Sequence, residues 1–327
     1  MIITKTPFRI SFVGGGSDLE AFYSQSKGAV LSTSINKYMY ISSHKFFEED
    51  KIRIKYSQTE TVSGLAEIKH PILRTALQKF NINGGIEVSS IADIPGGTGM
   101  GSSSSFTVGL LHNLHAATNS FASKEDLAKG ACEIEIDLLK EPIGKQDQYA
   151  AAYGGLNVIE FKQNGHVTVE PVYMNRDGLV QLEKNLYLYY IGNQRSASSI
   201  LAEQRNNTSQ ADKFKTLQNM VDLVYQLRDT LMAGNLDNFG SLMHENWMMK
   251  QQLASGISNP LINELYDLAL KNGALGGKLL GAGGGGFMLF YCPQEKQQKL
   301  NEALHKVRRF DFKFEQNGSQ LIHYGNE

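Results

Sequence analysis

Alternating apolar and polar positions predict strands in the first half of the chain. The segments are rich in β-branched and aromatic residues: FRISFV (8–13), KYMYISSH (37–44), IRIKYS (52–57), GIEVSSI (85–91) and LNVIEF (156–161). Apolar residues spaced by three or four predict helices over 103–118 and 123–139. The second helix starts like a capping box, with Ser123 as N-cap and Asp126 at the third helical position.

The second half is predicted to have longer helices and fewer strands. A strand near 185–192 precedes helices over about 212–234, 237–255 and 260–272. A strand (286–292), a helix (294–308) and a closing strand (319–325) complete the pattern. This order predicts an α+β protein, and we place the domain boundary within 160–185, dividing the chain into 1–175 and 176–327.

The composition narrows the class of protein. With 327 residues, 41% hydrophobic and 20% charged, the chain is typical of a globular protein with two domains. A net charge of −1 gives no basic field for nucleic acid or an acidic membrane. No apolar run approaches the roughly 20 residues that span a bilayer, and the N-terminus lacks a signal-peptide pattern, so we expect a cytoplasmic protein. Cys132 and Cys292 predict neither a disulfide framework nor a metal site.

The stretch PGGTGMGSSSS (95–105) is dense in glycine and serine. Glycines let the backbone approach an anion, and the helix that follows directs its N-terminal N–H groups to the same place. Serine hydroxyls at the join can cap the helix or bind a metal-phosphate. The stretch lacks the Gly-Lys-Ser/Thr of a P-loop and the glycine spacing of a dinucleotide fingerprint. The alternative is a flexible loop.

Several acids lie in EIEIDLLKEPIGKQDQYAAAYGG. On a helix, Glu133 and Asp137 share a face, whereas Glu135 points elsewhere. Pro142 ends this helix, and Asp147 follows in a polar turn before an alanine run. A carboxylate placed there can act as general base for a hydroxyl. The alternative is a solvated helix face and turn.

Charged residues and glycines also gather near both ends of the chain. Arg9 lies inside an apolar strand, where a cation is costly unless an acid pairs with it. Asp18 follows a glycine turn and can cap the next helix or hydrogen-bond sugar hydroxyls. The segment GGKLLGAGGGGFMLFY (276–291) holds a second glycine-dense loop. It is either another phosphate- or substrate-closing loop or a tight connection between strands.

Together these segments resemble those of the GHMP small-molecule kinases, which include galactokinase, homoserine kinase and mevalonate kinase. The family shows a Pro-x-Arg strand, a Pro-x-x-x-Gly-Leu-Gly-Ser-Ser loop and a C-terminal Gly-Ala-Gly-x-Gly-Gly segment. Here they read PFR, PGGTGMGSSS and GAGGGG, in the same order and spacing. The resemblance implies two α+β domains, the first like ribosomal protein S5 domain 2 and the second ferredoxin-like, with the site in the cleft between them.

The resemblance also implies phosphoryl transfer from ATP with Mg²⁺. Asp147 would be the catalytic base, with Arg9 as the ion-pair partner that keeps it ionised. Ser103 and Glu135 would hold Mg²⁺, with Glu133 as the alternative to Glu135. The residues that would wrap the ATP phosphates are Gly96, Gly97, Thr98, Gly99, Met100, Gly101, Ser102, Ser103 and Ser104.

The turn GGGSD bears on the acceptor. Galactokinases have Gly-Glu-His-Thr-Asp here, and this chain keeps Asp18 but has Gly15 and Gly16 in place of Glu and His, which argues against galactose. Within the family the chain looks most like the bacterial heptose kinases, which phosphorylate D-glycero-D-manno-heptose 7-phosphate at its anomeric hydroxyl. The expected substrate-binding residues are Gly16, Ser17, Asp18, Lys37, Arg195, Gly283 and Gly284.

An acceptor that carries a phosphate needs a further cation. In GNQRSASSIL, Arg195 precedes a helix whose N-terminus can bind the phosphate, and a capped helix with a surface arginine is the alternative. Lys37 and Lys278 are further candidates. The competing functions are a kinase of another sugar, such as fucose, and a non-catalytic sugar and ATP sensor. The expected assembly is a monomer or a homodimer.

Overall fold

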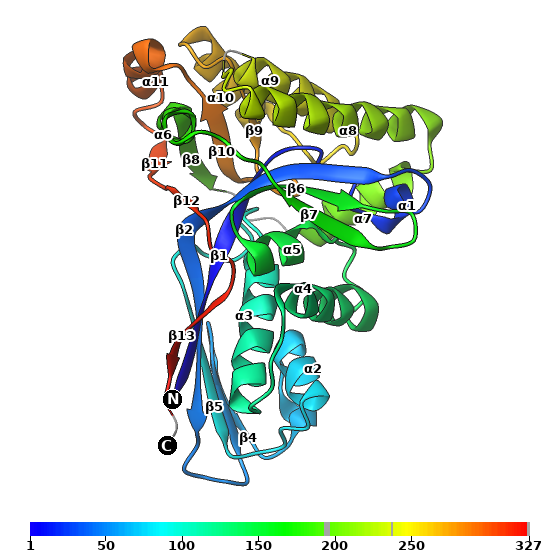
Figure 1. The fold of residues 1–327 in the computed structure, drawn as a ribbon, viewed down its shortest axis with the longest axis vertical. Coiled ribbons are helices and arrows are strands. Elements are labelled where there is room, and N and C mark those ends of the chain that lie inside the picture. Colours follow the sequence, from blue (N-terminus) through cyan, green and yellow to red (C-terminus); the bar gives the residue numbers. More distant parts are fainter. Residues whose placement is uncertain (193–196, 237, 326–327) are drawn as a thin grey trace.

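The computed structural model describes residues 1–192, 197–236 and 238–325. Two β-sheets with helices packed against them form the molecule, one mainly in the lower part of Figure 1 and one in the upper part. The predicted mixture of strands and helices is confirmed. Within the described ranges, no helix is both long and apolar enough to cross a membrane.

The larger sheet joins nine strands of the described chain. The main order is β13-β1-β2-β5-β3-β4, while β6 and β12 pair with β2, and β7 pairs with β6. β1 and β2 are antiparallel and extend from the lower into the upper part of the molecule (Figure 1). The strands of this sheet are β1 (Ile2–Val13), β2 (Gly28–Lys45), β3 (Ile52–Lys55), β4 (Thr59–Val62), β5 (Ile86–Ala92), β6 (Leu156–Phe161), β7 (Val167–Pro171), β12 (Phe314–Glu315) and β13 (Gln320–Tyr324).

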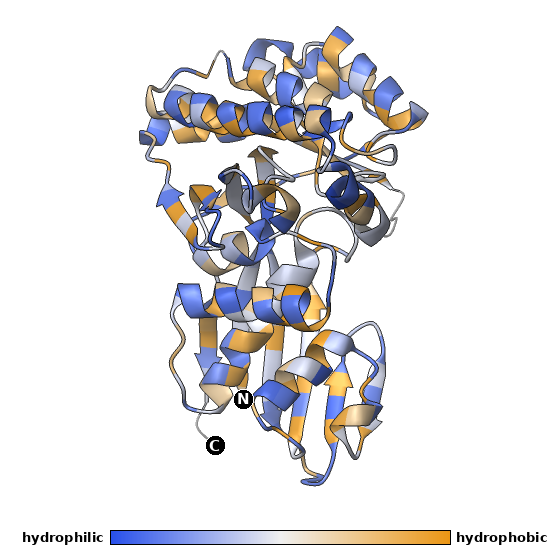
Figure 2. Cartoon of the chain, turned by 90° about the vertical axis from the view of Figure 1, so that its right-hand side faces the viewer, coloured by the Kyte–Doolittle hydropathy of each residue, from blue (hydrophilic) through white to orange (hydrophobic). Residues whose placement is uncertain are grey.

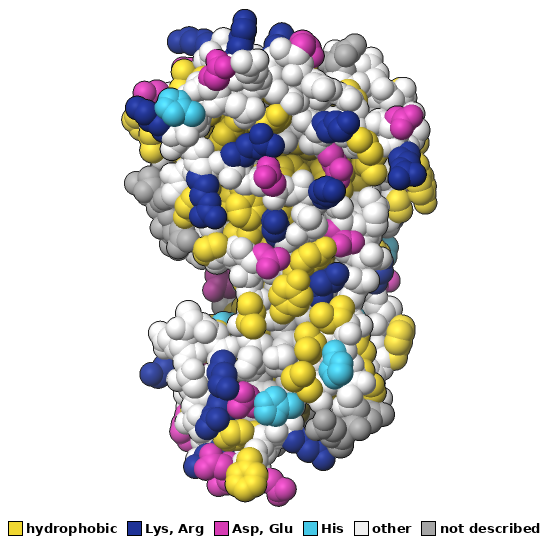
Figure 3. Space-filling view, turned by 90° about the vertical axis from the view of Figure 1, so that its left-hand side faces the viewer, with side chains coloured by type: hydrophobic (Ala, Val, Ile, Leu, Met, Phe, Trp, Pro, Cys, Tyr) yellow, Lys and Arg dark blue, Asp and Glu magenta, His cyan; other side chains and the backbone are white. Residues whose placement is uncertain are grey.

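Helices cover one face of the larger sheet, whereas the opposite face carries hydrophobic side chains interspersed with charged ones (Figures 1 and 3). The helix α3 packs against β1 and β2, and ten of its sixteen residues are buried. The helices of this part are α1 (Glu20–Tyr23), α2 (Pro71–Lys79), α3 (Ser102–Ala117), α4 (Lys124–Cys132) and α5 (Gln146–Tyr153).

The smaller sheet is antiparallel, in the order β11-β8-β10-β9. Hydrophobic and hydrophilic residues alternate along its helices (Figure 2), so that each helix buries one side and exposes the other. The elements of this part are α6 (Arg176–Asn185), β8 (Leu186–Gly192), α7 (Ala197–Asn207), α8 (Ala211–Met232), α9 (Phe239–Lys250), α10 (Pro260–Lys271), β9 (Gly276–Leu279), β10 (Gly286–Tyr291), α11 (Gln297–Ala303) and β11 (Arg308–Phe310).

The two parts share one core. The Phe12 ring at the end of β1 lies 5.3 Å from the Phe239 ring of α9, edge to face. The next residues continue the contact, because Gly14 N donates to Asn246 Oδ1 at 3.0 Å. The end of β1 is therefore held under α9, and the turn that follows it has a fixed position at the junction of the two parts.

Two predicted helices differ from the structure. The helix expected over 123–139 is α4 followed by a π-helical segment over Glu133–Leu138, although its capping box at Ser123 is present. The helix expected over 294–308 ends at Ala303, because Arg308–Phe310 pairs with β8 as a strand. In the second case sheet pairing satisfies the backbone groups that a longer helix would have used.

The chain returns to its first sheet at the end. β12 pairs with β2, and β13 pairs with β1. Residues 314–324 therefore belong to the sheet of the first part, although the predicted second domain spans 176–327. The boundary itself, between residues 175 and 176, falls at the start of α6 and stays a prediction.

Candidate functional site

A cleft lies at the junction of the two parts. Four segments form most of it: the glycine–serine loop (95–104), the N-terminal turn (14–18), the start of α5, and the C-terminal glycine loop (280–286). Residues of β1, α7, α9 and β9 complete its walls. The residues that line it include Arg9, Ser11, Gly15, Gly16, Asp18, Gly97, Gly99, Gly101, Ser102, Ser103, Ser104, Gln146, Asp147, Lys250, Lys278, Leu280, Gly281 and Gly283.

Every second residue of the glycine–serine loop is a glycine in the left-handed region. The φ angle is +74° at Gly97, +82° at Gly99 and +74° at Gly101. A backbone that alternates in this way forms a concave surface of N–H groups that binds anions. Gly99 also approaches Leu280 so closely that a Cβ would overlap the Leu280 carbonyl oxygen. These three glycines line the cleft, as the sequence predicted.

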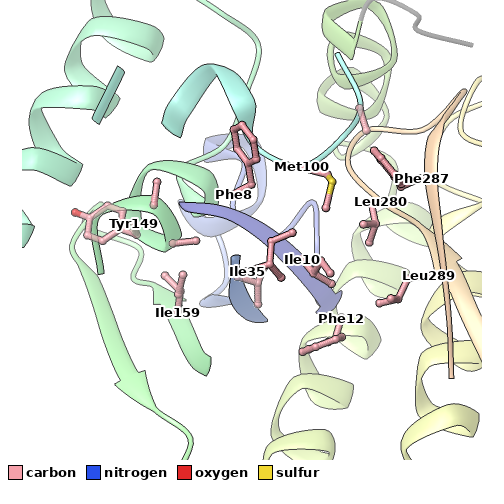
Figure 4. Close-up of a cluster of buried hydrophobic side chains, with 14 of the residues drawn as sticks. Phe8, Ile10, Phe12, Ile35, Met100, Tyr149, Ile159, Leu280, Phe287 and Leu289 are labelled. Atoms are coloured by element: carbon pink, nitrogen blue, oxygen red, sulfur yellow. The ribbon is translucent and has the colours of Figure 1, made fainter. Parts of the chain in front are cut away.

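Three residues of the predicted phosphate-binding set do not line the cleft. The buried Thr98 hydroxyl donates to Pro95 O at 3.0 Å. The Met100 side chain is fully buried near Leu280 and the Phe287 side chain of β10, as Figure 4 shows. Gly96 lies at the exposed outer end of the loop. Alternate positions of the loop face opposite sides, and a role of these three residues in phosphate binding stays a prediction.

Helix α3 begins at the cleft without a side-chain cap. Its N-cap is Gly101, with φ of 74° and ψ of 26°, and no side chain accepts a hydrogen bond from the first turn. Ser102, Ser103 and Ser104 line the cleft at this point. The free N–H groups and the positive end of the helix dipole together favour an anion.

Arg9 and Asp147 form a two-pronged ion pair at the base of the cleft. Arg9 Nε donates to Asp147 Oδ1 at 2.7 Å, and Nη2 donates to Oδ2 at 2.8 Å. Arg9 Nη1 donates to Gly99 O at 2.7 Å. Arg9 thus fixes the Asp147 carboxylate against the glycine–serine loop, while about a quarter of the Asp147 side chain remains exposed. The predicted pairing of these two residues is present.

Glu135 is buried beside the start of α3. Its Oε1 accepts from Ser103 Oγ at 2.7 Å, and its Oε2 accepts from Ser104 Oγ at 2.9 Å and Gln148 Nε2 at 2.8 Å. Burial raises the pKa of this carboxyl, and the hydrogen bonds from Ser103, Gln148 and Ser104 oppose the rise. Glu133, the alternative, is half-exposed and pairs with Lys79 at 2.7 Å, so it is excluded from the cleft.

This set of oxygens fits a magnesium ion. Among the residues described, no three His, Cys, Asp or Glu side chains lie together as a metal site, so an ion must draw most ligands from elsewhere. Mg²⁺ commonly does so, with one or two protein oxygens and the rest from phosphates and water. The Ser103 hydroxyl and the Glu135 carboxylate are adjacent, and the described residues provide no cation to neutralise Glu135. The assignment of Ser103 and Glu135 as ligands stays a prediction.

Asp18 faces the cleft from the N-terminal turn. Its Oδ1 accepts from Gly16 N at 2.9 Å and its Oδ2 from Gln146 N at 3.3 Å. Burial raises the pKa of Asp18, and so does the nearby Asp147 carboxylate. Asp18 and Gly16 both line the cleft, and their role in substrate binding stays a prediction. Ser17 does not line the cleft, because its hydroxyl donates to Gly14 O and Ala29 O and is used inside the turn.

Three polar residues of the cleft were missed by the sequence reasoning. Ser11 Oγ and Gln146 Oε1 are buried and have no hydrogen-bond partner among the described residues. Lys250 is buried on α9, where its Nζ donates to Gly15 O at 3.3 Å and Gln204 Oε1 at 3.0 Å. A signal for Lys250 was available, because it continues the face of α9 that buries Met243 and Trp247.

The remaining expected substrate residues have different outcomes. Lys37 lies in the irregular stretch of β2, with its Nζ over the Phe310 ring, and does not line the cleft. Gly283 lines the cleft, but the Gly284 amide donates to Ile257 O at 3.1 Å and faces away from it. Arg195 lies outside the described residues, so its predicted phosphate site stays a prediction.

Two family models match this chain. The model for the N-terminal domain of GHMP kinases matches residues 67–155, and the model for their C-terminal region matches residues 227–311. Together they cover more than half of the chain, including the glycine–serine loop, Glu135 and Asp147.

Known relatives align over nearly the whole chain. A D-glycero-alpha-D-manno-heptose 7-phosphate kinase of Campylobacter jejuni is 28% identical over 97% of both chains. The bifunctional fucokinase/GDP-fucose pyrophosphorylase of Arabidopsis thaliana is 27% identical over 94% of this chain, which spans 32% of that longer protein. The structure of a D-glycero-D-manno-heptose 1-phosphate kinase from Bacteriodes thetaiotaomicron superposes with a TM-score of 0.82, at 22% identity and full coverage of both chains. The predicted two-domain fold is thereby confirmed.

Proposed function

This chain belongs to the GHMP kinases, and we propose that it transfers the γ-phosphoryl group of ATP to the anomeric hydroxyl of D-glycero-D-manno-heptose 7-phosphate. As an ATP-dependent sugar kinase it has to place an anionic donor and a sugar hydroxyl in one dry site. The observation that carries the transfer step is the Arg9–Asp147 pair, held against the glycine–serine loop with the buried Asp18 on the other side.

Different residues of the cleft have different roles in the proposed transfer. The glycine–serine loop and the uncapped start of α3 bind the phosphates of ATP. Asp147 accepts the proton of the acceptor hydroxyl. At the same time the hydroxyl oxygen attacks the γ-phosphorus, and the bond between that phosphorus and the bridging oxygen of ADP breaks. Ser103 and Glu135 would hold Mg²⁺, which supplies positive charge to the phosphate oxygens when bound.

The acceptor side is a niche of buried polar atoms. Asp18 can accept hydrogen bonds from sugar hydroxyls, and Ser11 and Gln146 offer polar atoms that have no partner among the described residues. Such atoms are costly to leave unpaired, and polyhydroxylated ligands satisfy them. The heptose assignment is supported by the full-length alignment with the Campylobacter relative. Fucose is the second candidate, because two fucokinase relatives also match this chain.

A coupled assay of ADP release tests the proposed reaction. The acceptors are D-glycero-D-manno-heptose 7-phosphate, the free heptose, fucose, galactose and mannose, each with Mg-ATP. We expect turnover with the heptose phosphate and little with the others. Turnover with fucose alone would show that fucose is the acceptor, and the assignment as a sugar kinase would stand. Bound ATP without turnover on any sugar would favour the non-catalytic sensor.

The Arg195→Ala variant tests the predicted site for the acceptor's phosphate. We expect KM for the heptose phosphate to rise about 10- to 150-fold, the range for a lost hydrogen bond to a charged group, while KM for ATP stays unchanged. Arg205→Ala, an exposed arginine on α7, is the matched control. An unchanged KM in Arg195→Ala places the phosphate elsewhere.

A further inference from the structure

Lys278 is a buried lysine in β9 whose side chain reaches the cleft. It is 4% exposed and lines the cleft wall. Its backbone pairs with Leu289 of β10, but no hydrogen bond or ion pair joins its side-chain amino group to any residue in the described parts of the chain. Lys250 differs, because two oxygen acceptors hold its ammonium. Lys278 therefore carries the unpaired amino group at the junction of the two parts.

The surroundings of Lys278 favour a negative ligand. Burial lowers the pKa of Lys278 well below its ordinary value, and the positive charges of Lys250 and Arg9 lower it further. The negative charge of Asp18 opposes this effect only weakly. A buried ammonium without a partner is expensive. An anion bound beside it would remove that cost, and the binding would gain from the charge-assisted hydrogen bonds it forms.

The position of β9 indicates which anion this is. β9 leads directly into Leu280 and Gly281, whose backbones pack on Gly99 of the glycine–serine loop. Lys278 and Leu280, the residue that follows β9, both line the cleft. Lys278 thus lies on the wall that closes over the loop expected to hold the ATP phosphates.

The electrostatic neighbours of Lys278 belong to the reaction centre. Arg9 holds the proposed base Asp147 and the Gly99 carbonyl, and Asp18 belongs to the proposed acceptor side. Lys278 is near enough to both Arg9 and Asp18 for their charges to affect it. The anion that lies between donor loop and acceptor turn during transfer is the γ-phosphoryl group. The 7-phosphate of a heptose is separated from this point by the sugar itself.

We propose that Lys278 binds the oxygens of the γ-phosphoryl group of ATP and neutralises their charge during transfer. This inference rests on the proposed kinase function. It adds a cation from the second part of the chain to the glycine–serine loop of the first part. Phosphoryl transfer depends on such fixed positive charge around the equatorial oxygens.

The test is the contribution of the γ-phosphate to nucleotide binding. Calorimetry with Mg²⁺ gives Kd for ADP and for AMP-PNP, which differ in the γ-phosphoryl group. In Lys278→Met we expect the ratio of Kd for ADP to Kd for AMP-PNP to fall about 10- to 150-fold from the wild-type value. Kd for ADP should stay unchanged. Lys271→Met, an exposed lysine at the end of α10, should keep the wild-type ratio.

Further readouts separate this role from other ones. Removing an unpaired buried charge should leave Tm of Lys278→Met equal to or above that of the wild type. With any accepted sugar, kcat should fall while KM for the sugar stays constant. An unchanged Kd ratio in Lys278→Met overturns the proposal. The proposal also fails if the variant raises KM for the heptose phosphate but not KM for the free heptose, because Lys278 would then bind the phosphate of the acceptor. The Kd ratio needs no acceptor, so it tests Lys278 even if every sugar in the assay fails.

Discussion

Replacing Asp147 with asparagine is expected to lower kcat by about 10²- to 10⁴-fold, the usual contribution of a positioned general base. Asparagine has nearly the same shape and keeps an oxygen that can accept from Arg9 Nε, but it cannot take a proton from the acceptor hydroxyl. The glycine–serine loop is unaltered, so Kd for ATP should stay within a few-fold of the wild-type value. Rapid-quench measurements of a single turnover would report the chemical step directly.

The control for this experiment is Asp137→Asn. Asp137 is exposed on the segment that precedes α5. Its substitution removes the same charge as Asp147→Asn, but away from the cleft. It should leave kcat unchanged. Near-wild-type single-turnover rates in Asp147→Asn would remove the base assignment and leave Asp147 as an anchor for Arg9. The rate would then come from positioning and charge neutralisation alone.

The sequence predicted the parts of the site that follow local rules. The glycine–serine loop and the start of α3 were recognisable because glycine spacing and the apolar period of a helix are local signals. The Arg9–Asp147 pair was predictable because an arginine in an apolar strand needs an acid. These two residues are 138 positions apart, and it was the family resemblance, not the pattern, that joined them.

The residues that were missed or misplaced depend on long-range packing. Ser17 and Asp18 are neighbours in the sequence, but the Ser17 hydroxyl is used by the backbone of the turn. Lys250 and Lys278 come from the second part and reach the cleft because α9 packs both on β1 and on β9. The helical pattern can place Lys250 on the buried face of α9, but no local pattern in the sequence shows that this face and β9 meet the cleft.

The position of Glu135 shows the limit of helical periodicity. An α-helix through residues 123–139 would place Glu133 and Glu135 about 200° apart. The structure does bury Glu135 and expose Glu133, but through a π-helical segment that starts at Glu133. Such segments are rare and often occur at functional sites. The local sequence pattern gave no sign of the π-helical segment, because the partners of Glu135 at Ser103, Ser104 and Gln148 lie outside that segment.

Glu135→Gln is expected to lower kcat at least about a hundredfold, because the metal's stabilisation of the phosphate oxygens, worth several kcal/mol, depends on its ligands. The substitution should fold well. Gln148 Oε1 is buried and has no partner within the described residues, so a flip of the Gln148 amide lets it accept from the new amide at position 135. Raising Mg²⁺ in the presence of ADP should increase Tm of the wild type and have little effect on the variant.

The free energy of unfolding of Glu135→Gln should depend on pH differently from that of the wild type. Burial raises the pKa of the Glu135 carboxyl, so the folded protein holds this proton more tightly than the unfolded chain. Above the ordinary carboxyl pKa the unfolded chain loses its proton first, and the free energy of unfolding falls as pH rises towards the folded pKa. Glu135→Gln lacks this loss. Without Mg²⁺, the free energy of unfolding of the variant should therefore gain on that of the wild type as pH rises above the ordinary carboxyl pKa of about 4.3.

Urea unfolding at several pH values, without added metal, measures this difference. Glu133→Gln is the matched control, since Glu133 lies two residues away, pairs with Lys79 at the surface and has no contact with Ser103. It should follow the wild type in both the pH series and the Mg²⁺ titration. If Glu135→Gln kept the Mg²⁺-dependent rise in Tm, the carboxylate would be a structural partner of Ser103 and Ser104, and the metal would take its protein ligand elsewhere. If only the pH difference were absent, the pKa of the Glu135 carboxyl would be the same in the folded and unfolded protein, and the hydrogen bonds from Ser103, Ser104 and Gln148 would fully offset its burial.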